Sequence, residues 1–358
     1  MSKIEVYLDF LRFSIGSQTN LSFPLKEMDW GGLFEFAKKQ AIVGTLFVGI
    51  NKFNAKEIGI PYDILYEWIS LSEQIKIQNK ILNKRAVEVS QFLSKAGYRN
   101  CILKGQGNAL LYPDAYSRTS GDIDIWIEGS RKEINRFVKE NFPKAHGGYT
   151  HIDFPIFEDV IVEVHYIPSS MYSHKFNRRL QLFYTTHADE QYTNVVKLPD
   201  NSGAICVPTP MFNIVHQMSH IMNHFFVEGI GLRQFVDYYY LLKSLSQDKL
   251  NCDVKSLFKD LGLYKFSKGV MWILKEAFGL DESYLLVEPD RVTGLLILRE
   301  IQIGGNFGFY DKRYSLRKYG AIGRGVSDTY RLFKMTKYFP SESLWSIEKK
   351  LVHQFWKK

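Results

Sequence analysis

The sequence predicts an α+β fold, in which a small mixed β-sheet is flanked by helical regions on its N-terminal and C-terminal sides. Apolar residues recur at helical spacing over much of residues 1–97. Short runs rich in β-branched residues, with apolar and polar positions alternating, are concentrated in residues 98–207. Helical spacing returns over residues 208–358. We therefore expect three regions with these boundaries, and the central one contains the residues best suited to chemistry.

The N-terminal region is expected to be helical and to contribute no catalytic residue. Asp29 precedes an apolar run with helical spacing and is a candidate N-cap. One long helix is expected from Ile60 to about Ala96, and Gly97 would end it. The Lys-rich segment 74–80 allows nucleic-acid contact, but a solvated helix face is the interpretation that we prefer.

The most informative segment is Gly121-Asp122-Ile123-Asp124-Ile125, where two carboxylates lie two residues apart in an apolar, β-branched run. Alternate side chains of a strand share a face, so the aspartates and Trp126 are expected to point one way. The three isoleucines of 123–127 point the other way and suit a core. Two close carboxylates repel each other unless a cation lies beside them. Because Mg²⁺ prefers oxygen ligands, the pattern predicts a magnesium site.

A loop suited to phosphate binding is expected just before this strand. A short strand over 98–103 leads into Lys104-Gly105-Gln106-Gly107, where the glycines let backbone N–H groups approach a ligand and Lys104 adds positive charge. Arg118 and Ser120 then precede the aspartates. Phosphate-binding groups followed by metal-binding groups indicate a nucleoside triphosphate with its metal ions.

Glu163 is the candidate for the third carboxylate that a two-metal site requires. Two strands, over 151–157 and 160–166, are expected to be joined by a turn at Glu158-Asp159. Glu163 lies in the middle of the second strand, and His165 shares its face. A half-exposed edge strand would also accommodate this glutamate, so the metal-ligand interpretation depends on the aspartate pair.

Together these motifs resemble the nucleotidyltransferase superfamily of DNA polymerase β, and more narrowly its uncharacterised bacterial nucleotidyltransferases. The resemblance rests on Leu103-Lys104-Gly105, Arg118-x-x-Gly121-Asp122-Ile123-Asp124 and Glu163-Val164-His165. It implies a nucleotidyltransferase core and a metal-dependent enzyme. Such an enzyme moves an NMP, with AMP from ATP preferred, onto a hydroxyl acceptor and releases pyrophosphate.

The resemblance also implies roles for individual residues. Asp122, Asp124 and Glu163 would be the catalytic residues and would hold two Mg²⁺ ions, with Mn²⁺ as an alternative. A Gly-x-Arg-x-x-x-Asp stretch faces the active site in similar proteins, so Arg233 and Asp237 are further candidates for the nucleotide site, and they are expected to pair with each other. The remaining nucleotide contacts would come from Lys104, Gly105, Arg118, Gly121 and His165.

A row of histidines is the main competing signal. His216, His220, His224 and Glu228 recur every four residues and would line one face of a helix. A metal hydrolase that uses His216, His220 and His224 is one alternative function, and a nucleotide-binding module without turnover is another. We prefer a helix that borders the nucleotide cleft, with the histidines as hydrogen-bonding core residues, because Zn²⁺ sites on a single helix generally use two histidines.

Composition limits the location and the partners of the protein. The formal net charge of +8 suits nucleotides, nucleic acid or an anionic surface. Cys101, Cys206 and Cys252 have no metal-type spacing and make no disulfide framework, which indicates a reducing compartment. The sequence has no signal-peptide pattern, and its longest apolar run, 41–50, is too short to span a membrane. We therefore expect a cytoplasmic protein.

Other segments leave alternatives open. Residues 168–184 are basic and aromatic, and they form either an exposed helix or loop or a lid over the triphosphate or the acceptor. We further expect a helix over 131–141, a strand over 204–207 and a turn at 304–308. The acceptor is a protein, a small molecule or a nucleic acid. The C-terminal tail, from Tyr310 onward, allows nucleic-acid contact or forms an ordinary amphipathic helical end. Its basic residues are Lys312, Arg313, Arg317, Lys318, Arg324 and Arg331.

Overall fold

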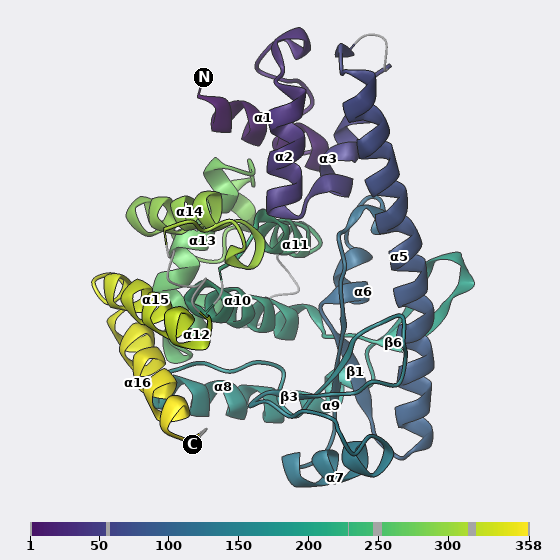
Figure 1. Cartoon of the computed structure of the whole chain (residues 1–358), viewed down its shortest axis with the longest axis vertical. Helices are drawn as coiled ribbons and strands as arrows, with labels where there is room; N and C mark the ends of the chain where they lie inside the picture. The colour runs from purple at the N-terminus through teal and green to yellow at the C-terminus, as the bar shows by residue number, and fades with distance from the viewer. Residues whose placement is uncertain (1, 55–57, 228, 246–252, 314–319, 357–358) are drawn as a thin grey trace.

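The computed structural model describes residues 2–54, 58–227, 229–245, 253–313 and 320–356. The expected α+β class is confirmed, because helices surround a four-stranded sheet and a separate two-stranded hairpin (Figure 1). Among the helices that the structure describes, none combines the length and the apolar character needed to cross a membrane. Several residues named above lie outside the described residues, namely Glu228, Cys252, Arg317, Lys318 and the side chain of Arg324.

The N-terminal segment is helical, as expected. Asp29 caps α2, since its Oδ1 accepts a hydrogen bond of 2.8 Å from the backbone N–H of Gly32. Gly97 follows the longest helix, α5, with a φ of +90°, a conformation that favours glycine. In Figure 1, α5 runs along one side of the molecule, from the N-terminal helices to the sheet. The elements are α1 (Lys3–Ile15), η1 (Leu25–Glu27), α2 (Trp30–Gln40), α3 (Val43–Ile50) and α5 (Tyr62–Lys95).

The four-stranded sheet has the order β1-β2-β4-β3, and its strands are shorter than the sequence suggests. Strands β1 and β2 are antiparallel, β2 and β4 are parallel, and β4 and β3 are antiparallel. Because β4 lies between β2 and β3, the alternative that Glu163 occupies an edge strand is wrong. The strands are β1 (Asn100–Leu103), β2 (Ile123–Ile127), β3 (His151–Asp153) and β4 (Val162–His165).

Short helices and the second hairpin complete the central segment. The helix expected over 131–141 is confirmed as α7. The hairpin contains the expected strand near 204–207 and a partner over 195–198, which its mixed and mostly exposed residues did not reveal. The elements are α6 (Gly105–Ala109), η2 (Ala115–Ser117), α7 (Arg131–Asn141), α8 (His174–Thr186), α9 (Ala188–Gln191), β5 (Val195–Leu198), η3 (Pro199–Asn201) and β6 (Gly203–Cys206).

The C-terminal segment is helical, as expected. Two basic residues of the tail are occupied within the fold: Arg313 forms an ion pair of 2.7 Å with Glu300, and the buried Arg331 donates to the carbonyl of Phe225. The elements are α10 (Pro210–Val227), α11 (Leu232–Lys243), α12 (Val254–Asp260), α13 (Tyr264–Glu276), η5 (Glu282–Tyr284), α14 (Arg291–Gly304), η6 (Asn306–Gly308), α15 (Gly320–Met335) and α16 (Pro340–Trp356).

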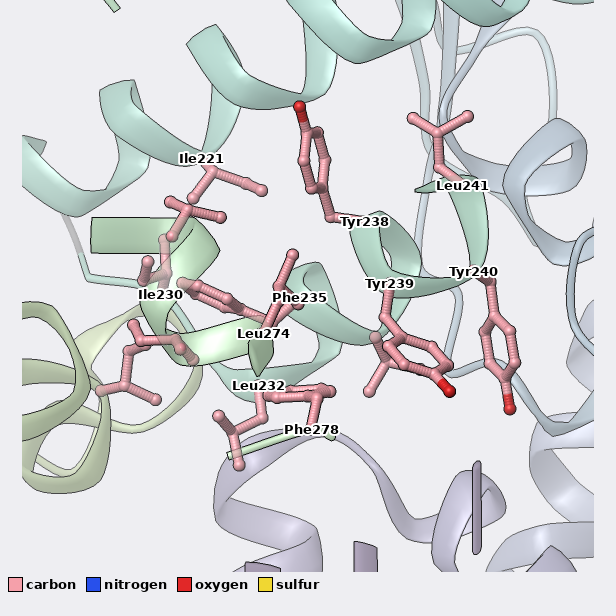
Figure 2. Packing of buried hydrophobic residues seen from close by; sticks show 14 of the residues in the cluster. Ile221, Ile230, Leu232, Phe235, Tyr238, Tyr239, Tyr240, Leu241, Leu274 and Phe278 are labelled. Atoms are coloured by element: carbon pink, nitrogen blue, oxygen red, sulfur yellow. The ribbon is translucent and has the colours of Figure 1, made fainter. Parts of the chain in front are cut away.

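The two faces of β2 enter different cores. The isoleucines of 123–127 pack in one buried cluster with residues of α5 and α7, as the alternation predicts. Trp126, on the other face, belongs to a larger cluster that contains residues of both the N-terminal and the C-terminal helices. Figure 2 shows part of that cluster around α11, where the Tyr238 hydroxyl donates to the carbonyl of Ile214 on α10 (3.3 Å). The boundaries of the three regions stay a prediction.

Candidate active site

Three carboxylates meet where β2 and β4 run side by side. The parallel register places Asp124 directly opposite Glu163, and Asp122 precedes the first residue of β2. One carboxylate oxygen from each of these three residues lies within 4.8 Å of the others. Residues far apart in the sequence are therefore brought together as a possible ligand set for a divalent ion.

Asp124 is buried and is held between two cationic partners. Its Oδ2 lies 2.9 Å from Lys104 Nζ, and its Oδ1 lies 2.8 Å from His165 Nε2. Burial opposes ionisation, but the Lys104 charge and the hydrogen bond from His165 hold the pKa of Asp124 well below its usual range. Asp122 differs, because repulsion from Asp124, with burial second, raises the pKa of Asp122.

His165 links two of the carboxylates. Burial opposes its protonation, but the hydrogen bond to Asp124 and the neighbouring Glu163 carboxylate raise the pKa of His165 to about 9. Its Nε2 lies 3.6 Å from Glu163 Oε2, and its Nδ1 lies 3.2 Å from the carbonyl oxygen of Ile167. A protonated ring donates from both nitrogens, so His165 fixes the orientation of Asp124 and lies next to Glu163.

Lys104 lies in the turn between β1 and α6. Its φ of +52° is unusual for a residue other than glycine, and Gly105 follows with a φ of +28°. Besides Asp124, the Lys104 ammonium contacts His220 Nε2 at 3.2 Å. An ammonium has only donors, so this nitrogen of His220 accepts the hydrogen bond. Burial, followed by the Lys104 charge, holds the pKa of His220 well below its usual range.

Arg118 and Asp237 form a buried bidentate pair, with both N···O distances at 2.8 Å. Tyr112 also donates to Asp237 (2.6 Å). The expected pairing of Arg233 with Asp237 is therefore wrong in detail, because the guanidinium of Arg118 takes both carboxylate oxygens. Arg233 instead donates to the carbonyl of Thr119 (2.8 Å) and lies beside the ring of Phe307, 5.9 Å from its centroid.

The histidines of α10 do not form a ligand set. His216 is buried and its Nε2 lies 3.2 Å from the carbonyl oxygen of Pro168, whereas His220 and His224 reach the cavity. Within the described ranges, the groups of three or more possible ligands are Asp122, Asp124 and Glu163, and His151, Glu163 and His165. The geometry thus favours the expected role of these histidines as residues of a helix that borders the cleft.

The carboxylates open into a cavity of about 340 Å³. Of the basic segment 168–184, Pro168 and Ser169 line this cavity, whereas Arg179 pairs with Asp260 (2.7 Å). The cavity brings together the residues assigned individually to catalysis or nucleotide contacts, although their roles stay predictions, whereas Gly107 and Ser120 of the expected phosphate-binding segment do not line it. These lining residues are Lys104, Gly105, Arg118, Gly121, Asp122, Asp124, Glu163, His165, Arg233 and Asp237.

The sequence did not reveal several other lining residues. His151 lay in an expected strand but carried no motif, and its place opposite His165 depends on the register of β3 with β4. Phe307 comes from a turn that is distant in the sequence, so no local pattern connects it with the aspartates. The other lining residues without a sequence signal are Asn108, Thr150, Gln217, Ile221, Asn223 and Gln234.

The class of the protein is shown by its match to a family of nucleotidyltransferases. Residues 26–279 match the family described as uncharacterised nucleotidyltransferase, which is more than half of the chain. The chain therefore belongs to this family, and the protein is a transferase enzyme.

Two further comparisons concern solved structures and curated proteins. The chain is similar to a solved structure, an antigenic nucleotidyltransferase-like protein from Paracoccidioides brasiliensis, with 14% sequence identity and a TM-score of 0.34. The similarity covers 61% of this chain and 94% of that protein. No curated protein matches the chain.

Proposed function

We propose that the protein transfers a nucleoside monophosphate, with AMP preferred, from a nucleoside triphosphate to a hydroxyl acceptor and releases pyrophosphate. The observation that carries this proposal is the convergence of Asp122, Asp124 and Glu163 within 4.8 Å at one cavity. Family membership supplies the reaction class. The acceptor is a protein, a small molecule or a nucleic acid, and the experiment below is designed to distinguish them.

The donor set suits divalent magnesium, with manganese as an alternative. All three groups are carboxylates, and hard ions such as Mg²⁺ take oxygen ligands. We assign two ions to Asp122, Asp124 and Glu163. When bound, such ions neutralise phosphate oxygens and lower the pKa of an acceptor hydroxyl.

The remaining residues bind and orient the substrate. Lys104 and Arg233 bring positive charge to the cavity, which suits the triphosphate, while Gly105 and Gly121 leave the backbone open to it. The acceptor oxygen forms a bond to the α-phosphorus as the bond from that phosphorus to the bridging oxygen breaks, and pyrophosphate leaves with that oxygen.

Arg118, Asp237 and His165 complete the arrangement. Arg118 also donates to Ser120 Oγ (2.8 Å), so its pair with Asp237 holds the segment just before Asp122. His165 orients Asp124 through its Nε2. We place all three at the nucleotide site because each lines the same cavity.

The test uses the purified full-length protein with Mg²⁺, cell extract and each of the four NTPs labelled at the α-phosphate. Transfer of the label to a macromolecule or small molecule identifies the nucleotide and the acceptor class. We expect Asp122→Asn, Asp124→Asn and Glu163→Gln to abolish labelling. Asp153→Asn is the matched control, because Asp153 lies opposite Glu163 in the sheet but is exposed and does not line the cavity.

Three outcomes would overturn the proposal. Nucleotide binding without transfer or pyrophosphate release would indicate a binding module without turnover. Release of orthophosphate from γ-labelled NTP, with no labelled acceptor, would indicate a hydrolase. Labelling that survives in Asp124→Asn would show that the carboxylates are not the catalytic group.

A further inference from the structure

A second group of possible ligands overlaps the carboxylate cluster. His151 and His165 lie opposite each other on β3 and β4, and Glu163 is two residues before His165, so it shares the same face. One ligand atom from each of the three side chains lies within 4.8 Å of the other two. The donors are two imidazole nitrogens and one carboxylate, which differ in kind from the all-oxygen cluster.

One oxygen of Glu163 faces both rings. Its Oε2 lies 3.2 Å from His151 Nδ1 and 3.6 Å from His165 Nε2. The three side chains line the cavity, and those of His151 and Glu163 are 32% and 24% exposed. Two of the three side chains are therefore open to an ion from the cavity, whereas His165 is buried behind them.

The surroundings of His165 match those of a metal-binding histidine. Its Nδ1 lies 3.2 Å from the carbonyl oxygen of Ile167, which orients the ring so that Nε2 points towards Glu163 and Asp124. Metal-binding histidines commonly donate their second ring N–H to a carbonyl or carboxylate in this way. A metal ion on Nε2 would replace the proton that this nitrogen donates to Asp124. For His151, Thr150 Oγ1 lies 3.2 Å from Nδ1, the same nitrogen that faces Glu163, so Thr150 is a polar neighbour of the ligand atom itself.

We propose that His151, Glu163 and His165 form a binding site for a divalent transition-metal ion, with Zn²⁺ as the best match, and that its occupancy excludes Mg²⁺ from Glu163. Two histidines and one glutamate with an open position are a usual Zn²⁺ ligand set, whereas Mg²⁺ prefers oxygen donors alone. Imidazole nitrogen favours zinc and its neighbours in the first transition series. Zn²⁺ would exclude Mg²⁺ because Glu163 belongs to both the carboxylate cluster and the histidine-containing group. This exclusion, unlike the zinc site itself, rests on the proposed function.

The first experiment measures metal binding without nucleotide. The metal-free full-length protein is titrated with Zn²⁺ by calorimetry, and with Co²⁺ by its visible absorption, which reports the coordination geometry of the bound ion. We expect one tight site, and His151→Ala should weaken it by at least about tenfold. His146→Ala is the matched control, since His146 is exposed and lies outside the group.

His151→Gln is a second variant in case His151→Ala folds poorly, because the amide can retain a hydrogen bond to Glu163 while it removes the imidazole ligand. Thermal melting verifies the fold of each variant. Failure of the wild type to bind Zn²⁺ at a single site, or an affinity in both His151 variants equal to that of the wild type, would overturn the assignment of the site.

The second experiment tests the exclusion. Micromolar Zn²⁺ added to the Mg²⁺-dependent transfer reaction should inhibit it, and His151→Ala should need at least about tenfold more Zn²⁺ for the same inhibition. Zinc binding without inhibition would refute the exclusion of Mg²⁺ from Glu163, but the assignment of the zinc site itself would stand. If no transfer is detected with any NTP, the proposed function fails, while the calorimetric result still decides the metal site by itself.

Discussion

Asp124 and Glu163 lie directly opposite each other on the parallel strands β2 and β4. The same residue, Asp124, is paired with Leu103 at the end of β1, so the next residue, Lys104, reaches its carboxylate at 2.9 Å. The cluster thus depends on strand register. A slip of one residue in β4 would turn Glu163 to the opposite face and remove it from the cavity.

Asp122→Asn and Asp124→Asn are expected to change the stability of the metal-free protein in opposite directions. From the sequence alone, loss of repulsion in either variant would leave the fold intact and raise the melting temperature. The structure supports this for Asp122, whose raised pKa reflects repulsion from Asp124. Asp124→Asn instead leaves Lys104 and His165 without their shared anion, so it should lower the melting temperature.

Melting curves recorded in EDTA measure both changes, and Asp153→Asn serves as the exposed control. An increase in melting temperature for Asp124→Asn would contradict the idea that this carboxylate is the counter-ion of both cations.

Asp237→Asn should destabilise the fold by about 3–5 kcal/mol, because it leaves the buried guanidinium of Arg118 without a compensating charge. Urea unfolding measures the difference. The control is Asp189→Asn, which removes an exposed partner of Arg99 and should cost far less, because solvent screens an exposed ion pair. Equal costs for the two variants would mean that the buried pair contributes no more than a surface one.

His216 should make stability dependent on pH. Burial, followed by the Lys104 charge, lowers the pKa of His216 from 6.5 to about 3, so the folded state keeps the ring neutral. In the unfolded chain the ring binds a proton more readily. The contribution of the neutral His216 ring to the stability of the folded state is therefore complete above about pH 6.5. It is lost progressively as the pH falls towards 3, by up to about 1.4 kcal/mol per pH unit.

Urea unfolding between pH 7 and pH 4.5 tests this dependence. His216→Gln keeps a donor for the Pro168 carbonyl but does not titrate, so its stability should fall less steeply than that of the wild type. His220 titrates in the same direction, and part of the slope should therefore remain. His146→Gln, at an exposed position, is the control for the substitution itself.

Gly44→Ala should destabilise the protein by about 1–3 kcal/mol. A Cβ at Gly44 would lie 2.3 Å from the backbone oxygen of Ser117, and Arg118 follows directly, so the added methyl group displaces the segment before β2. Gly31→Ala is a matched control at the same position of another helix, because its Cβ would meet the nearest atom, Ile64 Cδ1, at 3.6 Å. We expect that variant to be neutral or stabilised by up to about 1 kcal/mol.

The expected strands and helices agree with the structure where the local pattern is strong. The alternation of isoleucine and aspartate over 122–127 identified which side of β2 is buried in the sheet core. The pairing of Arg233 with Asp237 was inferred from helical spacing alone, and it was wrong because Arg118, which is far away in the sequence, competes for the same carboxylate.

The sequence by itself determined the α+β class, the alternating faces of the strands and the candidate carboxylates, because these depend on local spacing and residue chemistry. Only the tertiary structure decided that β4 lies between β2 and β3, that Lys104 neutralises Asp124, and that His151 and Phe307 reach the same cavity. These features depend on strand register and on helix packing between residues that are distant in the chain, and a local pattern contains no information about either.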